Sequence, residues 1–583
     1  MAWIVIAVLV VWLGLAGIRL LGAVSDARTG VAAMQRVDAR STGDISSFVD
    51  SVGGPDEPTT KEVKKDLLTA TESFRSARDA ADSPIVAPLK VLPVIGRQIR
   101  SISALSTAAV DTTVATSAAF DQLSQVAARG SSTPEMRMAA TTSTQEVLAE
   151  LRSATDDVHL GPKRGLIEPL AKAYDRLDGR LGRLRDTVER GLVGVTGVNS
   201  FLKGPSNYLI LASNNSEMRA GSGMYLQAGE LQVTDGRFDM SQLHPTADMT
   251  LPAPGTTVDA DVAALWGSLQ PDREWRSLNA TPRFDQSARM AADMWAASGQ
   301  PRVDGVIAVD VVGLQKLLEL VGPVDVRDPD GTVTTITAKN VVPQLLLKQY
   351  LGSDGKVERR DRLSDTAQAV FEALNERSYE PGRLLRALRS AGRGRHILMW
   401  STDPVQQAGW EALDMSGALP DNGLLLSVLN TGGNKLDQFL DISAVMNWES
   451  RGDTRHVSVT ITMTNSSPDA LPRYVAGPYP GLDTVAGEYR GILALTVPKA
   501  ASGPTAEGAD LFLSGEDGPT RLIGTKVGLG RGGSTTVTLG FDLPTSESTI
   551  EVLPSARVPA VVWTAGDSTW KDKKPHTVEL GDK

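Results

Sequence analysis

Apolar residues dominate the first 24 positions of the chain. No side chain from Met1 to Ile18 is charged, and after Arg19 the apolar run continues to Val24. About 20 residues of helix span the hydrocarbon core of a bilayer, and an arginine near one end can reach the headgroups. The pattern predicts a transmembrane anchor over residues 1–24. A cleaved signal peptide ending near Ala23-Val24-Ser25 is the alternative, but the apolar run is long for one and its start lacks a basic cluster.

Residues 25–198 have the spacing of amphipathic helices. Between Leu166 and Leu192, apolar side chains recur every three or four positions, at Leu170, Tyr174, Leu177, Leu181, Leu184 and Val188. This period gives a helix one apolar face. Helix breaks are expected at Gly53-Gly54-Pro55, Ser83-Pro84, Leu92-Pro93 and near Ser131 to Pro134. The segment predicts a helical stalk, in which Arg176, Arg180, Arg183 and Arg185 form a solvated face rather than a binding patch.

From Asn207 the pattern changes to strands that alternate with helices. Tyr208–Ala212 is a buried-strand run, and Met224–Phe238 predicts two strands that turn at Asp235-Gly236. Val306–Val309 predicts a strand, followed by a helix that Asp310 caps and Gly322 ends, and then by a strand at Val324 to Val326. Further helices are expected at 285–295, 365–375 and 382–390, and a last strand at 424–429. We interpret residues 199–441 as an α/β domain.

From Ile442 apolar residues recur at every second position, as at Val457, Val459, Ile461 and Met463. This period predicts a β-sandwich-like domain over residues 442–583. The segment from Gly528 to Gly533 matches a dinucleotide-binding fingerprint in form, but it leads into a strand, so we interpret it as a hairpin loop. Arg451-Gly452-Asp453 is interpreted as a turn between strands. The predicted fold class is multidomain α+β, with an anchor, a stalk, an α/β domain and a β domain.

Composition narrows the possible functions. The chain has 583 residues, which exceeds one hydrophobic core and supports several domains. Its net charge of −10 argues against nucleic-acid binding, which needs clustered basic residues. The absence of cysteine removes disulfides, zinc-thiolate sites and thiol nucleophiles. The five histidines are far apart in sequence, so no metal site is predicted from them.

Several separated segments resemble the bacterial domain-of-unknown-function 4012 family. They are YLILASNNSEMRAGSGMYLQAGELQVTDGRF (208–238), RVDGVIAVDVVGLQKLLELVGPVDV (302–326), HILMWSTDP (396–404) and LNTGGNKLDQFLD (429–441), with LKVLPVIGRQIRSI (89–102) in the helical part. They follow one another in the family's order and extend over most of the chain. The resemblance implies a membrane-anchored bacterial protein with no assigned reaction. It also implies that the chain after the anchor is extracytoplasmic, whereas Arg19 and Arg28 would place that side in the cytoplasm by the positive-inside rule.

The α/β part is also similar, more weakly, to the LytR-CpsA-Psr family, which transfers glycopolymers from polyprenyl pyrophosphate lipids to the cell wall. The segment from Asp304 to Val326 carries this similarity, together with the polar stretch Asn214–Arg219 and the basic stretch Arg359–Arg362. Two family elements have no counterpart here. No metal-binding Asp follows Arg219, and no Pro-Arg-Asp motif stands near His244. Whether the chain is an enzyme therefore stays open.

The predicted ligand site lies after the first buried strand. Arg219 is placed to bind a phosphate bidentately, Glu217 to hold a metal or orient Arg219, and Gly221 and Gly223 to let a ligand approach the backbone. The predicted ligand-binding residues are Asn215, Glu217, Arg219, Arg359, Arg360, Arg362 and Lys435, with Arg283 and Arg289 as further candidates. The alternative for this cluster is a structural ion pair. No catalytic residue is predicted.

The resemblances, together with the predicted anchor, imply two function classes. The first is an extracytoplasmic envelope protein, single-pass in the cell membrane, that binds or transfers a polyprenyl-pyrophosphate-linked glycan. The second is a non-catalytic envelope or polysaccharide-export scaffold whose β domain contacts other envelope proteins. No cofactor is identified, although Asp304 and Asp310 flank a short strand and such a carboxylate pair is compatible with magnesium. The first class predicts that the arginine residues line an apolar groove.

Overall fold

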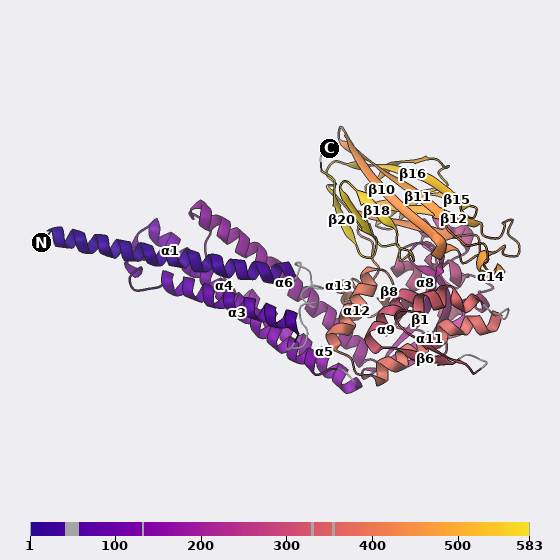
Figure 1. Cartoon of the computed structure of the whole chain (residues 1–583), viewed down its shortest axis with the longest axis horizontal. Helices are drawn as coiled ribbons and strands as arrows, with labels where there is room; N and C mark the ends of the chain where they lie inside the picture. Colours follow the sequence, from indigo (N-terminus) through magenta and orange to yellow (C-terminus); the bar gives the residue numbers. More distant parts are fainter. Residues whose placement is uncertain (1, 41–56, 131–132, 328–330, 352–355, 582–583) are drawn as a thin grey trace. The chain divides into compact units, whose positions relative to one another are not determined.

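The computed structural model describes the chain except for residues 1, 41–56, 131–132, 328–330, 352–355 and 582–583, and leaves out the side chains of residues 2–10, 40, 356–361 and 381. The described residues form two compact units (Figure 1). Unit 1 comprises residues 1–131, 135–199 and 379–386, and unit 2 comprises residues 132–134, 200–378 and 387–583. The chain is therefore multidomain and mixed α and β, as predicted.

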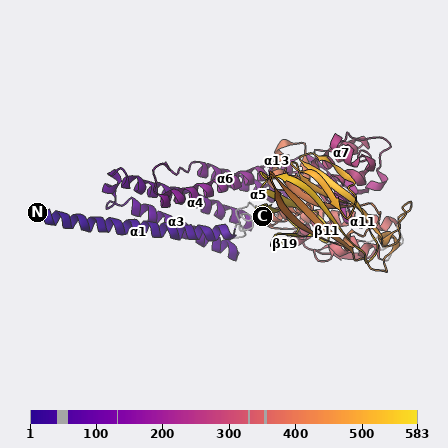
Figure 2. The same cartoon turned by 90° about the horizontal axis from the view of Figure 1, so that it is seen from above.

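Unit 1 is built of long helices that lie side by side (Figures 1 and 2). They are α1 (Ala2–Arg40), α3 (Pro58–Ala81), α4 (Ile95–Ala128), α5 (Pro134–Asp156) and α6 (Glu168–Lys203), with the short 3₁₀ helix η1 (Ala87–Val91) before α4. The predicted breaks at Ser83-Pro84 and Leu92-Pro93 are confirmed, because they separate α3, η1 and α4. The predicted break at Gly53-Gly54-Pro55 lies outside the described residues.

The apolar face predicted for α6 points into the core of unit 1. Leu181 and Val188 are buried, and Leu177 and Leu184 pack against buried side chains of other helices. Phe120 of α4 and Leu67 of α3 belong to the same core. The other positions of α6 are rich in Lys and Arg. Burial of the apolar face explains why this sequence still forms one long helix.

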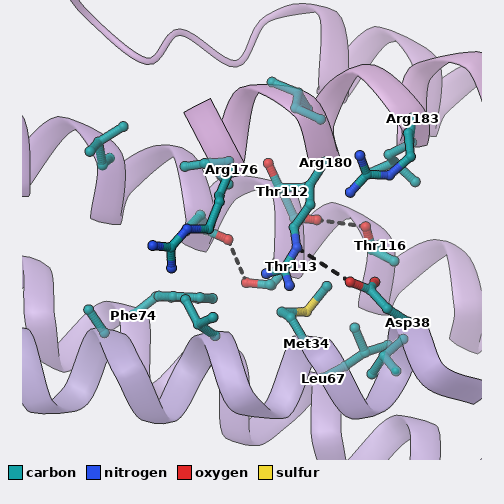
Figure 3. A pocket seen from close by; sticks show the side chains of 18 of the residues that line it. Met34, Asp38, Leu67, Phe74, Thr112, Thr113, Thr116, Arg176, Arg180 and Arg183 are labelled. Atoms are coloured by element: carbon teal, nitrogen blue, oxygen red, sulfur yellow. Dashed lines mark hydrogen bonds and ion pairs between the residues drawn. The ribbon is translucent and has the colours of Figure 1, made fainter. Parts of the chain in front are cut away.

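The basic face of α6 lies beside a cavity. Arg176 and Arg183 are exposed, as a solvated face requires, but with Arg180 they line a cavity of about 430 Å³ inside unit 1 (Figure 3). The exposed positions of Arg176 and Arg183 fit the predicted solvated face, and the cavity beside them was not predicted. Periodicity assigns a residue to a face of its own helix, but a cavity depends on the neighbouring helices as well.

Residues 2–24 of the predicted anchor form the first part of α1. Among the residues that the structure describes, no helix is long and apolar enough to cross a membrane. The side chains of residues 1–10, which belong to the predicted anchor, lie outside the description. In the remainder, Trp12, Ala16 and Leu20 pack against Val86, Leu89 and Ile99 near the start of α4.

Unit 2 begins with a mixed six-stranded sheet. Its strands are β1 (Ser206–Met218), β2 (Gly223–Thr234), β3 (Arg237–Met240), β4 (His244–Pro245), β5 (Gly305–Val309) and β8 (Ile397–Ser401), in the order β3-β2-β1-β5-β8 with β4 on β2. Only β1 and β5 pair in parallel. The turn predicted between β2 and β3 is confirmed: Asp235 and Gly236 have φ angles of 49° and 76°, as a two-residue hairpin turn requires.

Helices accompany this sheet. They are α7 (Ala260–Trp266), α8 (Phe284–Ala297), α9 (Val311–Val321), α10 (Val341–Leu346), α11 (Lys356–Glu376), α12 (Pro381–Arg393) and α13 (Pro404–Ala412). The core between α8 and the sheet contains Leu209, Leu211, Val306, Trp275 and Met294. The helix predictions near 285, 311, 365 and 382 are confirmed, since α8, α9, α11 and α12 cover them.

The predicted strand–helix–strand unit needs a correction. The strand β5 and the helix α9 form as expected, but β6 (Val324–Arg327) pairs with β7 (Val333–Ile336) in a separate two-stranded sheet. Both edges of β5 are already occupied, one by β1 and the other by β8. No edge is left on β5 for β6 to join.

The C-terminal part of unit 2 is a sandwich of two six-stranded sheets. One has the order β13-β16-β11-β10-β18-β19 and the other β14-β15-β12-β9-β17-β20. The strands are β9 (Gly423–Asn430), β10 (Leu440–Arg451), β11 (Thr454–Asn465), β12 (Tyr489–Pro498), β13 (Ser502–Glu507), β14 (Leu513–Asp517), β15 (Thr520–Leu529), β16 (Ser534–Pro544), β17 (Thr549–Leu553), β18 (Val562–Ala565), β19 (Ser568–Lys571) and β20 (His576–Glu579). The alternation along β11 buries Val457, Val459, Ile461 and Met463 between the sheets, as predicted.

Three local predictions for this region have different outcomes. The strand at 424–429, expected in the α/β domain, is β9 and pairs with β12 and β17 of the sandwich. The segment from Gly528 to Gly533 is not a hairpin loop, because it joins β15 to β16, which lie in different sheets. The turn at Arg451-Gly452-Asp453 is confirmed: it joins the paired strands β10 and β11, with a φ of 66° at Gly452.

Candidate functional site

The polar residues predicted to form a ligand-binding loop continue strand β1. Asn214 pairs with Met224 and Met218 with Gly223 of β2, with a register irregularity between Asn214 and Met218. A side chain at Gly223 would collide with the backbone of Asn214. This glycine therefore allows the close approach of β2 to β1.

Glu217 and Lys435 form an ion pair at this end of β1. The side chain of Lys435 is 3% exposed and that of Glu217 is 13% exposed. The Lys435 Nζ atom also lies 5.0 Å from the ring centroids of both Tyr350 and Tyr474, within the range of cation–π attraction. Burial lowers the pKa of Lys435 to about 7, because an ammonium loses hydration there.

Arg219 donates hydrogen bonds to three backbone carbonyls. Its Nε reaches the oxygen of Arg276 at 3.0 Å, and its Nη1 reaches those of Met218 and Asn430 at 3.1 Å and 2.8 Å. Burial lowers the pKa of Arg219 to about 10. The guanidinium edge predicted to hold a phosphate is thus largely used in linking β1 to η4 (Trp275–Ala280) and β9.

Asn215 is buried and binds Asp310. Its Nδ2 donates to Asp310 Oδ2 at 2.6 Å and to the carbonyl of Ala556 at 2.9 Å. The same carboxylate oxygen lies 2.7 Å from His396 Nδ1, while Oδ1 accepts from the amides of Val312 and Gly313. The prediction that Asp310 caps the helix α9 is confirmed.

Asp304 and Asp310 do not face each other. They lie at opposite ends of β5, and Asp304 accepts from the amide of Asn207 at 2.8 Å. Six residues of extended chain separate their Cα atoms by about 20 Å. In the described part of the chain, no group of three or more His, Cys, Asp or Glu residues is placed to hold a metal ion.

A fully buried ion pair, which sequence reasoning missed, lies beside these residues. Asp437 and Arg557 are both 0% exposed, with Arg557 Nη1 2.9 Å from Asp437 Oδ1. Asp437 also accepts from Tyr489 Oη, Asn430 Nδ2 and the amide of Met218, at 2.8 to 3.0 Å. Asp437 belongs to the segment LNTGGNKLDQFLD, so the resemblance contained a signal for it. Nothing in the sequence marked Arg557.

The other predicted residues lie elsewhere. Arg359 and Arg360 belong to α11, and their side chains lie outside the described residues. Arg362 is half-buried on α11, which packs against β3, β6 and α9. Arg283 pairs with Asp261 at 2.9 Å, and Arg289 with Asp259 at 3.0 Å. Of the predicted set, the structure thus brings together Asn215, Glu217, Arg219 and Lys435.

Comparison with known proteins supports one of the two resemblances. Residues 203–350 match the model of a family described as a protein of unknown function, DUF4012. The matched segment runs from the end of α6 to Tyr350 and includes Asn215, Glu217 and Arg219. The match supports the domain-of-unknown-function 4012 resemblance over these residues. The finer similarity to the LytR-CpsA-Psr family is not shown.

A solved structure, the Lin1025 protein from Listeria innocua, is similar at 13% identity over 36% of this chain and 78% of that chain, with a TM-score of 0.20. At that score the similarity carries no argument about the fold. None of the curated proteins matches the chain.

Proposed function

We propose that the chain is a non-catalytic scaffold protein of the bacterial cell envelope, anchored in the cell membrane by residues 1–24, with the rest of the chain extracytoplasmic. We infer the absence of catalysis from the polar cluster at the end of β1, whose side chains are already paired within the protein. Glu217 is paired with Lys435, Arg219 with three carbonyls, and Asp310 with Asn215, His396 and the start of α9. Buried polar groups that satisfy one another stabilise a fold and leave little for a ligand.

Exposed apolar side chains in unit 1 support the membrane anchor. On α1, Ile18 and Leu21 are 67% and 72% exposed. In the turn from the end of η1 to the start of α4, Val91 and Val94 are 83% and 70% exposed. This turn is close to α1, because Leu89 and Ile99 pack against Ala16. Contiguous exposed apolar surface marks an interaction site, and a bilayer would cover both segments at once.

The β-sandwich offers a surface for a partner protein. The segment between β11 and β12 exposes Tyr474, Tyr479, Leu482 and Val485. Exposed aromatic and aliphatic side chains of this kind suit contact with another envelope protein. The docking role expected of the β domain is therefore assigned to residues 473–488.

The membrane contact is tested with single-cysteine labels, since the natural sequence has no cysteine. The full chain carrying bimane at Val94→Cys is reconstituted in vesicles that contain brominated phospholipids. Bimane fluorescence is expected to be quenched at this position and to stay unquenched in the matched Arg190→Cys variant on α6. Equal fluorescence in both variants would contradict membrane contact of the turn.

Orientation is tested separately. A reporter that works only in the cytoplasm, fused after Lys583, is expected to be inactive in cells. Reporter activity would overturn the extracytoplasmic assignment and favour the orientation that Arg19 and Arg28 indicate.

The alternative function, transfer of a polyprenyl-pyrophosphate-linked glycan, requires Arg219 to hold a diphosphate. Binding of a short-chain prenyl pyrophosphate to the full chain is measured with and without magnesium, for the wild type and for Arg219→Ala. The scaffold proposal predicts no saturable binding that depends on Arg219. Saturable binding that the substitution abolishes would replace the proposal with the glycan-transfer function.

A further inference from the structure

Unit 1 contains an apolar cavity of about 430 Å³. Four helices line it: α1, α3, α4 and α6. Sites for small molecules in proteins commonly measure roughly 300–1,000 Å³, so the cavity has the size of a ligand site. Most of its wall is aliphatic or aromatic, and includes Val31, Met34, Leu67, Phe74, Phe120 and Leu181.

Three of the four threonines in the wall use their hydroxyl protons within their own helix. Thr112, Thr113 and Thr116 of α4 each donate a hydrogen bond of 2.8 Å to a carbonyl of their own helix, four residues earlier. Their hydroxyl protons are therefore already used, and their methyl groups add to the apolar lining. A ligand in this part of the cavity meets no free hydroxyl donor from these three residues.

A row of arginines lies along the cavity. Arg176, Arg180 and Arg183 follow one another at intervals of four and three on α6, so they share one face of the helix (Figure 3). Figure 3 shows them with Met34, Leu67 and Phe74 across the cavity. Arg180 pairs with Asp38 at 3.3 Å. Among the described residues, neither Arg176 nor Arg183 forms an ion pair, so three guanidiniums face one carboxylate.

We propose that this cavity binds one single-chain lipid that carries a phosphate. The alkyl chain would lie among the apolar side chains, where its removal from water is favourable. The phosphate would bind at the exposed guanidiniums of Arg176 and Arg183, because a guanidinium matches phosphate oxygens with two parallel hydrogen bonds. A neutral lipid would leave Arg176 and Arg183 without an anionic partner, and inorganic phosphate would leave the apolar wall empty. The proposal uses unit 1 alone and does not depend on the scaffold function or on the anchor.

The test uses dodecyl phosphate with a photoreactive diazirine at the end of its chain, added to the full chain in an amphipathic polymer. After irradiation, cross-linked positions are mapped by peptide mass spectrometry. The proposal predicts cross-links on peptides that contain Leu67, Phe120 or Leu181. An excess of dodecyl phosphate should suppress them, whereas dodecyl maltoside and inorganic phosphate should not.

Two variants separate specific binding from partition onto apolar surface. The double variant Arg176→Ala/Arg183→Ala is expected to reduce cross-linking at these peptides about tenfold or more at subsaturating probe, since each charged hydrogen bond lost weakens binding. The matched variant Arg190→Ala removes an exposed arginine of the same helix that does not line the cavity, and should leave cross-linking unchanged. Circular dichroism confirms that the helices form. Cross-links confined to residues 2–24, equal competition by dodecyl maltoside, or no effect of the double variant would each overturn the proposal.

Discussion

Two buried basic side chains in unit 2 lie against carboxylates. Lys435 lies between Glu217 and two tyrosine rings, and Arg557 lies against Asp437 with neither side chain exposed. Moving a lone charge out of water costs several kcal/mol, while a well-paired charge roughly offsets this cost. Removing one member of such a pair is therefore more harmful than removing both.

This asymmetry gives a first prediction for Lys435. Lys435→Met should lower the free energy of unfolding of unit 2 by about 3 kcal/mol, because the carboxylate of Glu217 loses its partner in a buried place. The double variant Lys435→Met/Glu217→Gln should recover most of the loss. Urea unfolding followed by tryptophan fluorescence reports on this unit, since of the ten tryptophans only Trp3 and Trp12 belong to unit 1. A double variant as unstable as the single one would show that the pair is not coupled.

Lys435 should also make the free energy of unfolding depend on pH. Burial lowers the pKa of Lys435 from 10.5 to about 7. Between these values the unfolded chain holds a proton that the folded chain has lost, so the free energy of unfolding rises with pH from about 7 to about 10. Below pH 7 both states are protonated and this contribution is constant. The rise should be smaller in Lys435→Met, and an identical pH profile in both proteins would mean that Glu217 keeps Lys435 protonated.

At the residue scale the sequence predicted four residues that the structure brings together. It selected Asn215, Glu217, Arg219 and Lys435, which do meet at the end of β1. Their partners could not be predicted, because they come from distant segments: the oxygen of Asn430 for Arg219 and Asp310 for Asn215. Whether a polar cluster is open or satisfied depends on such long-range contacts.

At the scale of elements, the spacing of apolar residues and the capping and turn residues predicted where helices and strands lie. They did not predict which strands pair. The helix α9, with its Asp310 cap and Gly322 end, and the β2–β3 turn follow from local residue chemistry. The pairing of β6 with β7 and of β9 with β12 does not, since it depends on which sheet edges are free. A short apolar run such as 424–429 fits a buried strand in either domain.

The cap of α9 provides a prediction at this scale. Asp310→Ala removes the oxygen that accepts from two helix amides, and it removes the partner of both Asn215 and His396. A cap is worth about 1 kcal/mol and each orphaned buried donor costs roughly as much again, so the expected loss is about 2–4 kcal/mol. Hydrogen exchange should show lost protection at Val312 and Gly313.

Asp403 is the matched control for Asp310. It caps α13 by accepting from Val405 and Gln406, and no other hydrogen bond to its carboxylate is found among the described residues. Asp403→Ala should therefore cost only about 1 kcal/mol. Equal losses in the two variants would contradict the role assigned to the Asn215–Asp310–His396 contacts.

At the scale of the whole molecule, the α/β sheet and the sandwich of unit 2 are joined by buried polar contacts. Asp437 binds Arg557 and Tyr489 of the sandwich on one side and the amide of Met218 in β1 on the other. A second link joins Thr281 and Arg283 to Asp517 of β14. Burial raises the pKa of Asp517 to about 6. These polar groups are buried, so no water can replace a partner that is lost. We therefore expect the sheet and the sandwich to unfold together.

The variant Arg557→Met tests the buried polar contacts between the sheet and the sandwich. The substitution leaves the Asp437 carboxylate fully buried without its cation, which should cost about 3–5 kcal/mol and split the unfolding of unit 2 into two transitions. Arg557→Met/Asp437→Asn removes both charges and should restore a single transition. Calorimetry of the full chain, compared with the wild type, resolves the steps.

The control is Arg531→Ala, which breaks an ion pair with an Asp469 side chain that is 93% exposed and should cost less than about 1 kcal/mol. If Arg557→Met unfolds in one step like the control, the sandwich and the sheet are held together by their apolar contacts, and Asp437 only fixes the path of the chain after β9.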